Sequence, residues 1–186
     1  MMVSAGPFVF FLAIISIVAA SPIDRRDVPT SICTTIASGT LRTTNGHNVH
    51  FVDDTLTFGS APLAVEFQSC QPNFGRYDGQ DGRPIGGHIY VPSTKKCLTI
   101  ASGAPIPFTV SQQPCETVDD SRQTFSNFIK QSDDKIYYVG NTQVDGSTIF
   151  HGDVCPSGYF GPVSSATSGT AALHCVNDPH VVGFNI

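Results

Sequence analysis

Pairs of acidic side chains are the first groups in this 186-residue chain with the chemistry for catalysis. Asp53-Asp54, Asp119-Asp120 and Asp133-Asp134 each place two carboxylates side by side. Two carboxyl groups that flank a sugar linkage can hydrolyse a glycosidic bond. Adjacent carboxylates are more typical of charged turns, and the chain has no Gly-x-Ser-x-Gly motif for a hydrolase serine. We therefore expect a protein that is not an enzyme.

Histidine side chains are the candidate ligands for a metal ion. His47 and His50 are three residues apart. His151 and Asp153 are two apart, which places them on one face if the segment is a strand. A solvated loop explains this pair more simply, and the chain has no Cys-x-x-Cys or His-Glu-x-x-His motif. We expect neither a metal ion nor a cofactor.

The beginning of the chain has the pattern of a secretory signal. The run Phe8 to Ala20 is apolar except for Ser16, and it is too short for a typical membrane span. We expect a signal peptide over residues 1–20 and a secreted, extracellular protein. Arg25-Arg26 resembles a processing site for a kexin-type protease, the alternative being an ordinary charged linker. The expected organisation is a pro-segment at 21–26 and one domain at 27–186.

Composition excludes some partners and predicts disulfides. The net charge is −5, and no basic cluster is larger than Lys95-Lys96, so we expect no binding to nucleic acid or to membranes. Six cysteines behind a signal peptide predict three disulfides. We expect a monomer.

Short runs of β-branched and aromatic residues, separated by Gly, Pro, Asn-Gly and Asp-Gly, predict an all-β fold. These runs repeat three times. The middle set is "GHIYV", "KCLTI", "PFTVSQQPC" and "SRQTFSNFI"; the first is "GTLRT", "DTLTF" and "LAVEFQSC"; the third is "KIYYV", "GSTIF", "AALHC" and "VVGFNI". In this alignment Cys70, Cys115 and Cys175 coincide. The expected units cover roughly residues 38–85, 86–132 and 133–186.

Three units of four short strands resemble a β-trefoil of the ricin-B lectin type. The resemblance is specific in the middle unit, where "GHIYVPSTKKCLTI", "QQPC" and "RQTF" follow the family's Gly-x-Ile, Lys-Cys-Leu, Pro-Cys and Gln-x-Trp pattern. Phe125 stands where the family usually has Trp. The resemblance implies a disulfide-stabilised trefoil with the pairs Cys33–Cys70, Cys97–Cys115 and Cys155–Cys175. It also implies that Phe125 and Phe184 are buried plugs.

The core expected with these two plugs is apolar and comes from all three units. Its other members are Leu56, Phe67, Ile89, Val91, Leu98, Ile100 and Val139.

Lectins of this family bind sugar through an Asp after the first cysteine, an aromatic ring before the second, and an Asn before the Gln-x-Trp. In the middle unit these positions hold Thr99, Gln113 and Arg122, and only Gln123 of the Gln-x-Trp motif matches. In the first unit the first two positions hold Thr57 and Gln68, and in the third unit Leu173 takes the stacking position. Ordinary galactose chemistry is therefore not expected, although Gln113 and Gln123 remain candidate ligand contacts.

The segment from Cys155 to Ala172 is long for a connection between two strands. Tyr159 and Phe160 lie in it between Gly158 and Gly161. Long loops on rigid scaffolds often carry binding residues. An exposed Tyr159-Phe160 pair would stack on a glycan or enter a protein cleft; alternatively, both rings cap the end of the barrel.

The sequence thus predicts a secreted ricin-B-like protein that binds carbohydrate through a non-standard site. The alternative is a secreted interaction protein, such as a protease inhibitor or an effector, on the same scaffold without lectin activity. The expected partner is a glycan or an extracellular protein.

Overall fold

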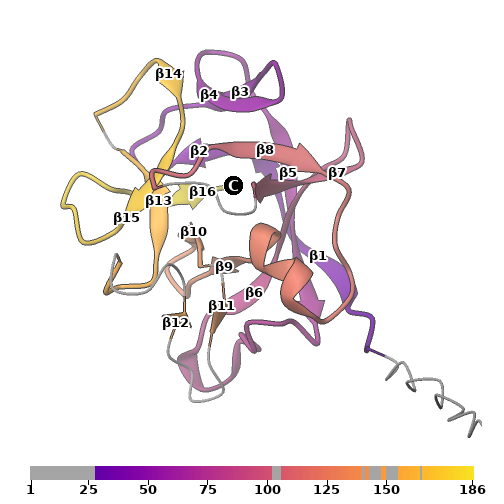
Figure 1. The fold of residues 1–186 in the computed structure, drawn as a ribbon. Coiled ribbons are helices and arrows are strands. Elements are labelled where there is room, and N and C mark those ends of the chain that lie inside the picture. Colours follow the sequence, from indigo (N-terminus) through magenta and orange to yellow (C-terminus); the bar gives the residue numbers. More distant parts are fainter. Residues whose placement is uncertain (1–27, 102–105, 140, 143–147, 150–154, 164) are drawn as a thin grey trace, which may run out of the picture.

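The computed structural model describes residues 28–101, 106–139, 141–142, 148–149, 155–163 and 165–186 (Figure 1). The expected signal peptide and pro-segment, and His151 and Asp153, lie outside these ranges. The described chain is all-β with two short 3-10 helices, which confirms the expected all-β class. The first strands are β1 (Ile32–Thr40), β2 (Arg42–Thr43), β3 (Val49–Val52), β4 (Thr55–Phe58) and β5 (Ala64–Gln71).

The middle of the chain contains η1 (Gln80–Gly82), β6 (Ile85–Val91), β7 (Lys96–Ile100), β8 (Val110–Gln113), η2 (Ser121–Ser126) and β9 (Phe128–Lys130). The remaining strands are β10 (Ile136–Tyr138), β11 (Asn141–Thr142), β12 (Thr148–Ile149), β13 (Phe160–Pro162), β14 (Gly169–Thr170), β15 (Leu173–Cys175) and β16 (Phe184–Asn185).

Two of the three acidic pairs form turns and the third is held by polar contacts. Asp53 and Asp54 have φ of 47° and 59° and connect β3 to β4, as a two-residue hairpin requires. Asp133-Asp134 occupies the turn between β9 and β10. Asp120 caps η2, and Asp119 accepts a hydrogen bond from Arg76. Each of the three carboxylate pairs thus has a structural role in the described fold.

The strands pair antiparallel throughout. One sheet runs in the order β1-β5-β6-β9-β10-β13-β15, with β7 and β8 attached through β6, and β16 joined to both β10 and β2. A second sheet has the order β14-β4-β3. In Figure 1 the C terminus lies near the middle of the view, with β3 and β4 above it, β13 and β15 to the left and β6 below. The pairs formed by the described strands leave the main sheet open between β1 and β15.

Three disulfides join Cys33 to Cys70, Cys97 to Cys115, and Cys155 to Cys175. These are the expected pairs. Their places in the sheet differ. Cys33 lies directly opposite Cys70 across β1 and β5, whereas Cys97 lies opposite Gln113 and bonds to the cysteine two residues further on.

One main hydrophobic core contains most of the expected residues. Phe184 is fully buried, and so are the expected core residues Leu56, Phe67, Ile89, Val91, Leu98 and Ile100. Val139 is buried as well, but it belongs to a smaller cluster with Ile129 and Tyr137.

The expectation of a buried plug at Phe125 is wrong. This side chain is only half-buried, because in η2 it is Gln123, Thr124 and Ser126 that turn inward. Phe128, at the start of β9, is fully buried and packs edge-on against Tyr138 at 5.5 Å between ring centroids.

Candidate functional site

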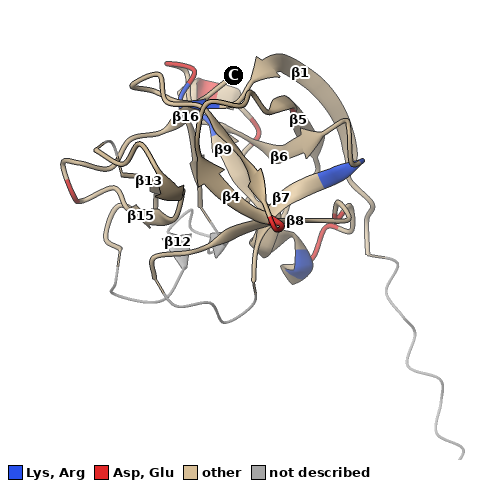
Figure 2. Cartoon of the chain, turned by 90° about the horizontal axis from the view of Figure 1, so that it is seen from above, with Lys and Arg blue, Asp and Glu red and all other residues tan. Residues whose placement is uncertain are grey.

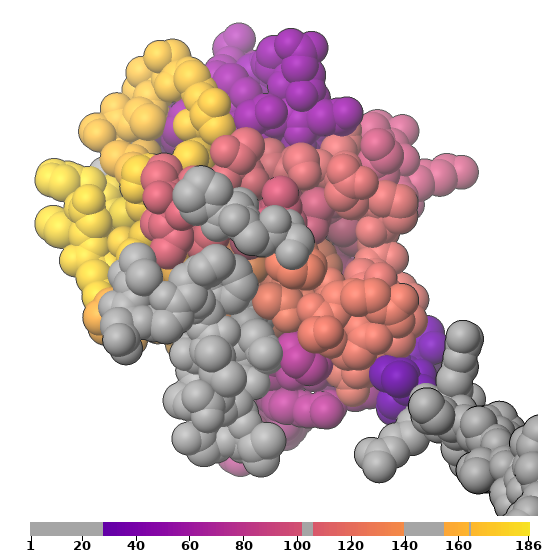
Figure 3. Space-filling model, viewed as in Figure 1, coloured from indigo at the N-terminus to yellow at the C-terminus, as the bar shows by residue number. Residues whose placement is uncertain are grey.

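A surface hollow of about 390 Å³ lies where β7, β8 and η2 meet. In Figure 3 this part of the chain, pink to orange in the colour scale, occupies the centre and right of the face shown. The hollow is lined by Thr99, Ile100, Ala101, Ser111, Gln113, Pro114, Glu116, Arg122, Phe125 and Ser126.

The walls of the hollow are fixed by covalent and polar contacts. β7 and β8 are neighbouring antiparallel strands, with Thr99 opposite Ser111, and the Cys97–Cys115 disulfide ties the end of β8 to β7. The Thr99 hydroxyl donates a hydrogen bond of 2.9 Å to the carbonyl of Phe125, which joins β7 to η2. The shape of the hollow is therefore set before any ligand arrives.

The three middle-unit positions taken from the lectin pattern converge here. Thr99, Gln113 and Arg122 all line the hollow. Gln113 is exposed, whereas Thr99 is 8% exposed and its hydroxyl proton is used by the Phe125 carbonyl. The comparison with the lectin pattern thus predicted where the hollow lies. The residue types at the three positions nevertheless differ from those that the lectin family uses to bind sugar.

Gln123 does not line the hollow. It is 2% exposed, its amide nitrogen donates to the Ser31 hydroxyl at 2.6 Å, and its amide oxygen accepts from the Phe74 backbone N–H at 3.0 Å. Gln123 therefore anchors η2 to two distant segments. In this structure its side chain is not available to a ligand.

Glu116 lines the hollow as well, although the sequence reasoning did not single it out. Its carboxylate lines the hollow, with Oε1 accepting from the Val118 N–H at 3.1 Å and Oε2 lying 3.9 Å from Nε of Arg122. The side chain is 29% exposed, so lone pairs remain accessible. The sequence did contain a signal for Glu116, namely its position directly after Cys115. The Cys97–Cys115 disulfide brings Cys115 beside β7, and Glu116 comes with it.

Arg122 is held in place by Asp120. Its Nε lies 3.0 Å from both carboxylate oxygens, and one terminal nitrogen lies 2.9 Å from Oδ2. The hydrogen bond from Arg122 holds the pKa of Asp120 below its ordinary value, and the same bond raises the pKa of Arg122. With Glu116 nearby, one cation faces two carboxylates. The hollow is therefore better suited to neutral, hydroxyl-rich ligands than to anions.

No family model, curated protein or solved structure matches this chain. The functional argument thus depends on the residues and their geometry.

The Tyr159-Phe160 pair is divided between the surface and the core. Phe160 is fully buried and packs against Phe108, with 4.9 Å between ring centroids, so it offers no surface to a ligand. The segment expected to be one long loop contains β13 and β14, and Phe160 pairs with Tyr138 and Cys175. Tyr159 is half-buried and stacks on Tyr137 at 5.9 Å.

The corresponding positions of the other two units have structural contacts. Thr57 donates to the carbonyl of Thr55, and Gln68 donates to Glu66 at 3.4 Å. Leu173 is fully buried in the main core.

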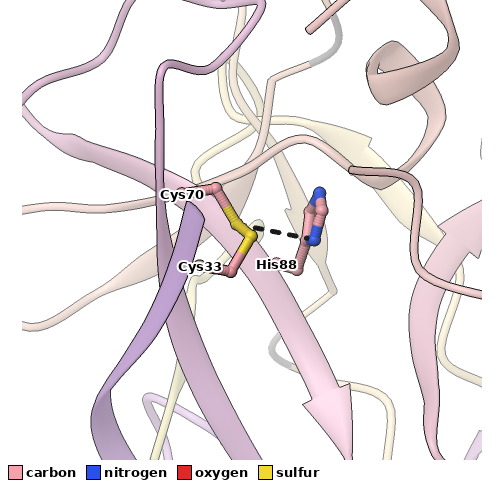
Figure 4. Close-up of side chains that lie close together, drawn as sticks. All are labelled: Cys33, Cys70 and His88. Atoms are coloured by element: carbon pink, nitrogen blue, oxygen red, sulfur yellow. Dashed lines mark hydrogen bonds between the residues drawn. A yellow bond between two sulfur atoms is a disulfide. The ribbon is translucent and has the colours of Figure 1, made fainter. Parts of the chain in front are cut away.

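Figure 4 shows the one group of three potential metal ligands among the described residues: Cys33, Cys70 and His88. The two sulfur atoms are bonded to each other, so neither is a thiolate that could coordinate a metal ion. His88 is 2% exposed, its Nδ1 lies 3.6 Å from Sγ of Cys70, and burial lowers the pKa of His88 to about 4. The imidazole is thus neutral at ordinary pH and packs against the disulfide.

Proposed function

We propose that this protein is a secreted carbohydrate-binding protein that holds a neutral glycan in the hollow between β7, β8 and η2. The observation that carries the proposal is the convergence of Gln113, Glu116 and Arg122 on one pre-shaped hollow. Glu116 supplies the carboxylate acceptor that the threonine at position 99 lacks. Charge-assisted hydrogen bonds of this kind contribute about 1.5–3 kcal/mol each.

The remaining lining groups suit a sugar. The exposed amide of Gln113 can both donate to and accept from hydroxyls. Phe125, half-buried, and Pro114 supply apolar surface for the C–H face of a pyranose. Arg122 presents its remaining N–H groups from a position fixed by Asp120. Among the described lining residues Glu116 is the single carboxylate, whereas glycoside hydrolysis requires two, so we propose binding without catalysis.

The proposed scaffold is a divergent ricin-B-like β-trefoil. Its support is the threefold sequence repeat, the pairing of β16 with both β2 and β10, and a main core with residues from all three expected units. An extracellular location is supported by the three disulfides and by the lack of free cysteines. No described helix is long and apolar enough to cross a membrane.

A glycan array, followed by titration calorimetry on the best neutral hit, tests the proposal. Glu116→Gln removes the charge and keeps the shape, and Gln113→Ala removes the amide; we expect each to weaken binding about tenfold or more. Gln68→Ala is the matched control, because Gln68 occupies the corresponding position of the first unit. A hit whose affinity is unchanged in both hollow variants would refute this location.

A second candidate function, protein binding, is favoured by one observation. Among the described strands β1 pairs only with β5, and none of its nine residues is charged (Figure 2). Two of its side chains are well exposed, Ile32 at 77% and Ile36 at 45%. Such an edge can accept a strand from another protein. An array without hits, together with a co-purifying extracellular protein that is lost in an Ile32→Lys variant, would favour this function.

A further inference from the structure

A second hollow lies apart from the first and shares no residue with it. It has a volume of about 200 Å³ and is lined by Gly82, Pro84, Gln131, Ser132 and Tyr159. Three separate segments form it: the end of η1 with the residues that follow, the turn between β9 and β10, and the residue before β13.

Tyr159 is held rigidly in this hollow. Its backbone N–H donates to the Ser157 hydroxyl at 3.2 Å, and its carbonyl accepts from the N–H of Val176 at 2.9 Å. The Cys155–Cys175 disulfide closes the same region. The ring stacks on Tyr137 with an interplanar angle of 27°. Because these contacts already fix Tyr159, a ligand that stacks on its ring does not have to immobilise the side chain. The entropic cost of binding is therefore lower, which favours affinity.

The polar groups beside the ring are neutral and accessible. Backbone hydrogen bonds fix the turn between β9 and β10. The Gln131 N–H donates to the Lys135 carbonyl, and the Gln131 carbonyl accepts from the N–H of Asp134. Within the described part of the chain, the side chain of Gln131 is left without a hydrogen bond, and Ser132 is exposed. The amide and the hydroxyl are thus free to bind hydroxyl groups of a ligand.

Three ion pairs involve residues next to the lining residues in the chain. Lys135 pairs with Asp133 at 2.7 Å, and Lys130 pairs with Asp134. Between Gly82 and Pro84, Arg83 pairs with Asp78 at 3.1 Å. These cations are thus compensated, and the five lining residues are themselves uncharged, so the hollow offers an anionic ligand no free cation among them.

We propose that this hollow is a second glycan subsite, which takes one pyranose ring with equatorial hydroxyls stacked on Tyr159. Equatorial substituents leave both faces of the ring as flat C–H surfaces, which match an aromatic side chain, and place the hydroxyls at the rim within reach of Gln131 and Ser132. The volume is below the roughly 300–1,000 Å³ of sites that enclose a drug-sized ligand, so it holds one ring while the rest of the glycan stays outside.

This inference uses other residues than the proposed function and holds even if the first hollow binds nothing. If both hollows bind, one chain carries two sugar sites on one rigid scaffold. Such a protein gains avidity on a polymeric or clustered glycan without any new contact.

The test is a titration of the ¹⁵N-labelled mature protein with cellotetraose, followed by NMR. We expect shifts of the Gln131 side-chain amide and the Ser132 backbone N–H. Tyr159→Phe keeps the flat ring and should bind as the wild type does. Tyr159→Leu keeps apolar volume without a ring face and should weaken this site about tenfold. Near-UV circular dichroism and the melting temperature establish that both variants fold.

Gln113→Ala separates this site from the first hollow, because it should leave the Gln131 shifts unchanged. The inference is overturned if cellotetraose at millimolar concentration shifts neither Gln131 nor Ser132. It is also overturned if folded Tyr159→Leu binds at this site as tightly as the wild type. Shifts confined to Gln113 and its neighbours would support the first hollow and exclude the second.

Discussion

Replacing Phe184 by alanine is expected to destabilise the protein far more than the same change at Phe125. Phe184 is fully buried in the main core and lies opposite both Ile136 and Thr43, so that β16 connects β10 with β2. Removing a fully buried Phe side chain costs about 3–5 kcal/mol, from lost burial and from the cavity left behind. Phe125 is half-buried at the rim of the first hollow, so its loss should cost about 1 kcal/mol.

Urea denaturation with the disulfides intact measures both changes in the free energy of unfolding. With an m-value of about 2 kcal/mol/M, Phe184→Ala should lower the midpoint by about 2 M, and Phe125→Ala by about 0.5 M. Phe128→Ala is the matched comparison, because Phe128 is fully buried and should behave like Phe184. Equal losses for Phe125→Ala and Phe184→Ala would refute the placement of Phe125 and restore the lectin-like plug.

Three further outcomes are expected. Burial lowers the pKa of His88 from 6.5 to about 4, so the folded protein binds fewer protons than the unfolded chain. The contribution of His88 to stability should therefore be fully present above pH 6.5 and be lost, by about 3 kcal/mol in all, as the pH falls to 4, and His88→Gln should flatten this part of the pH dependence in denaturation curves at several pH values. Titration calorimetry with lactose should give no millimolar binding, because Glu116 and Phe125 supply the carboxylate and the ring of the hollow from other positions than Thr99 and Gln113, where the lectin pattern has them; a clear isotherm would show that the galactose site is intact. Replacing Cys97 and Cys115 by serine should lower the unfolding free energy by about 3 kcal/mol and weaken glycan binding at the first hollow, and unchanged binding would mean that the disulfide does not shape it.

Much of the fold could be predicted from the chain alone. The threefold repeat of short apolar runs predicted Phe67, Ile89 and Leu98 as core, and all three are fully buried. The resemblance to the lectin family, together with the alignment of Cys70, Cys115 and Cys175, predicted the three disulfides. The middle-unit motif led to Gln113 and Arg122, which meet in the first hollow.

Phe160 shows what the chain alone could not decide. Its run of Gly, Tyr and Phe has no clear alternation, so the pattern does not say which ring turns inward. The packing decides it: a Cβ at Gly161 would lie 2.0 Å from the Val182 carbonyl oxygen, so glycine allows that backbone to approach and β13 to dock on the core. Phe160 then points inward, and Tyr159 is left at the surface.

The sequence by itself determined the all-β class and most of the core, since these follow from short strand-like runs and from a repeat, and the resemblance to the lectin family supplied the cysteine pairs. Only the tertiary structure placed Glu116 in the first hollow, left Phe125 partly exposed at the edge of the core and brought Tyr159 beside Gln131. Each of these depends on contacts between segments far apart in the chain. The physical reason is that a hollow is made by the relative positions of several elements, which no single stretch of sequence specifies.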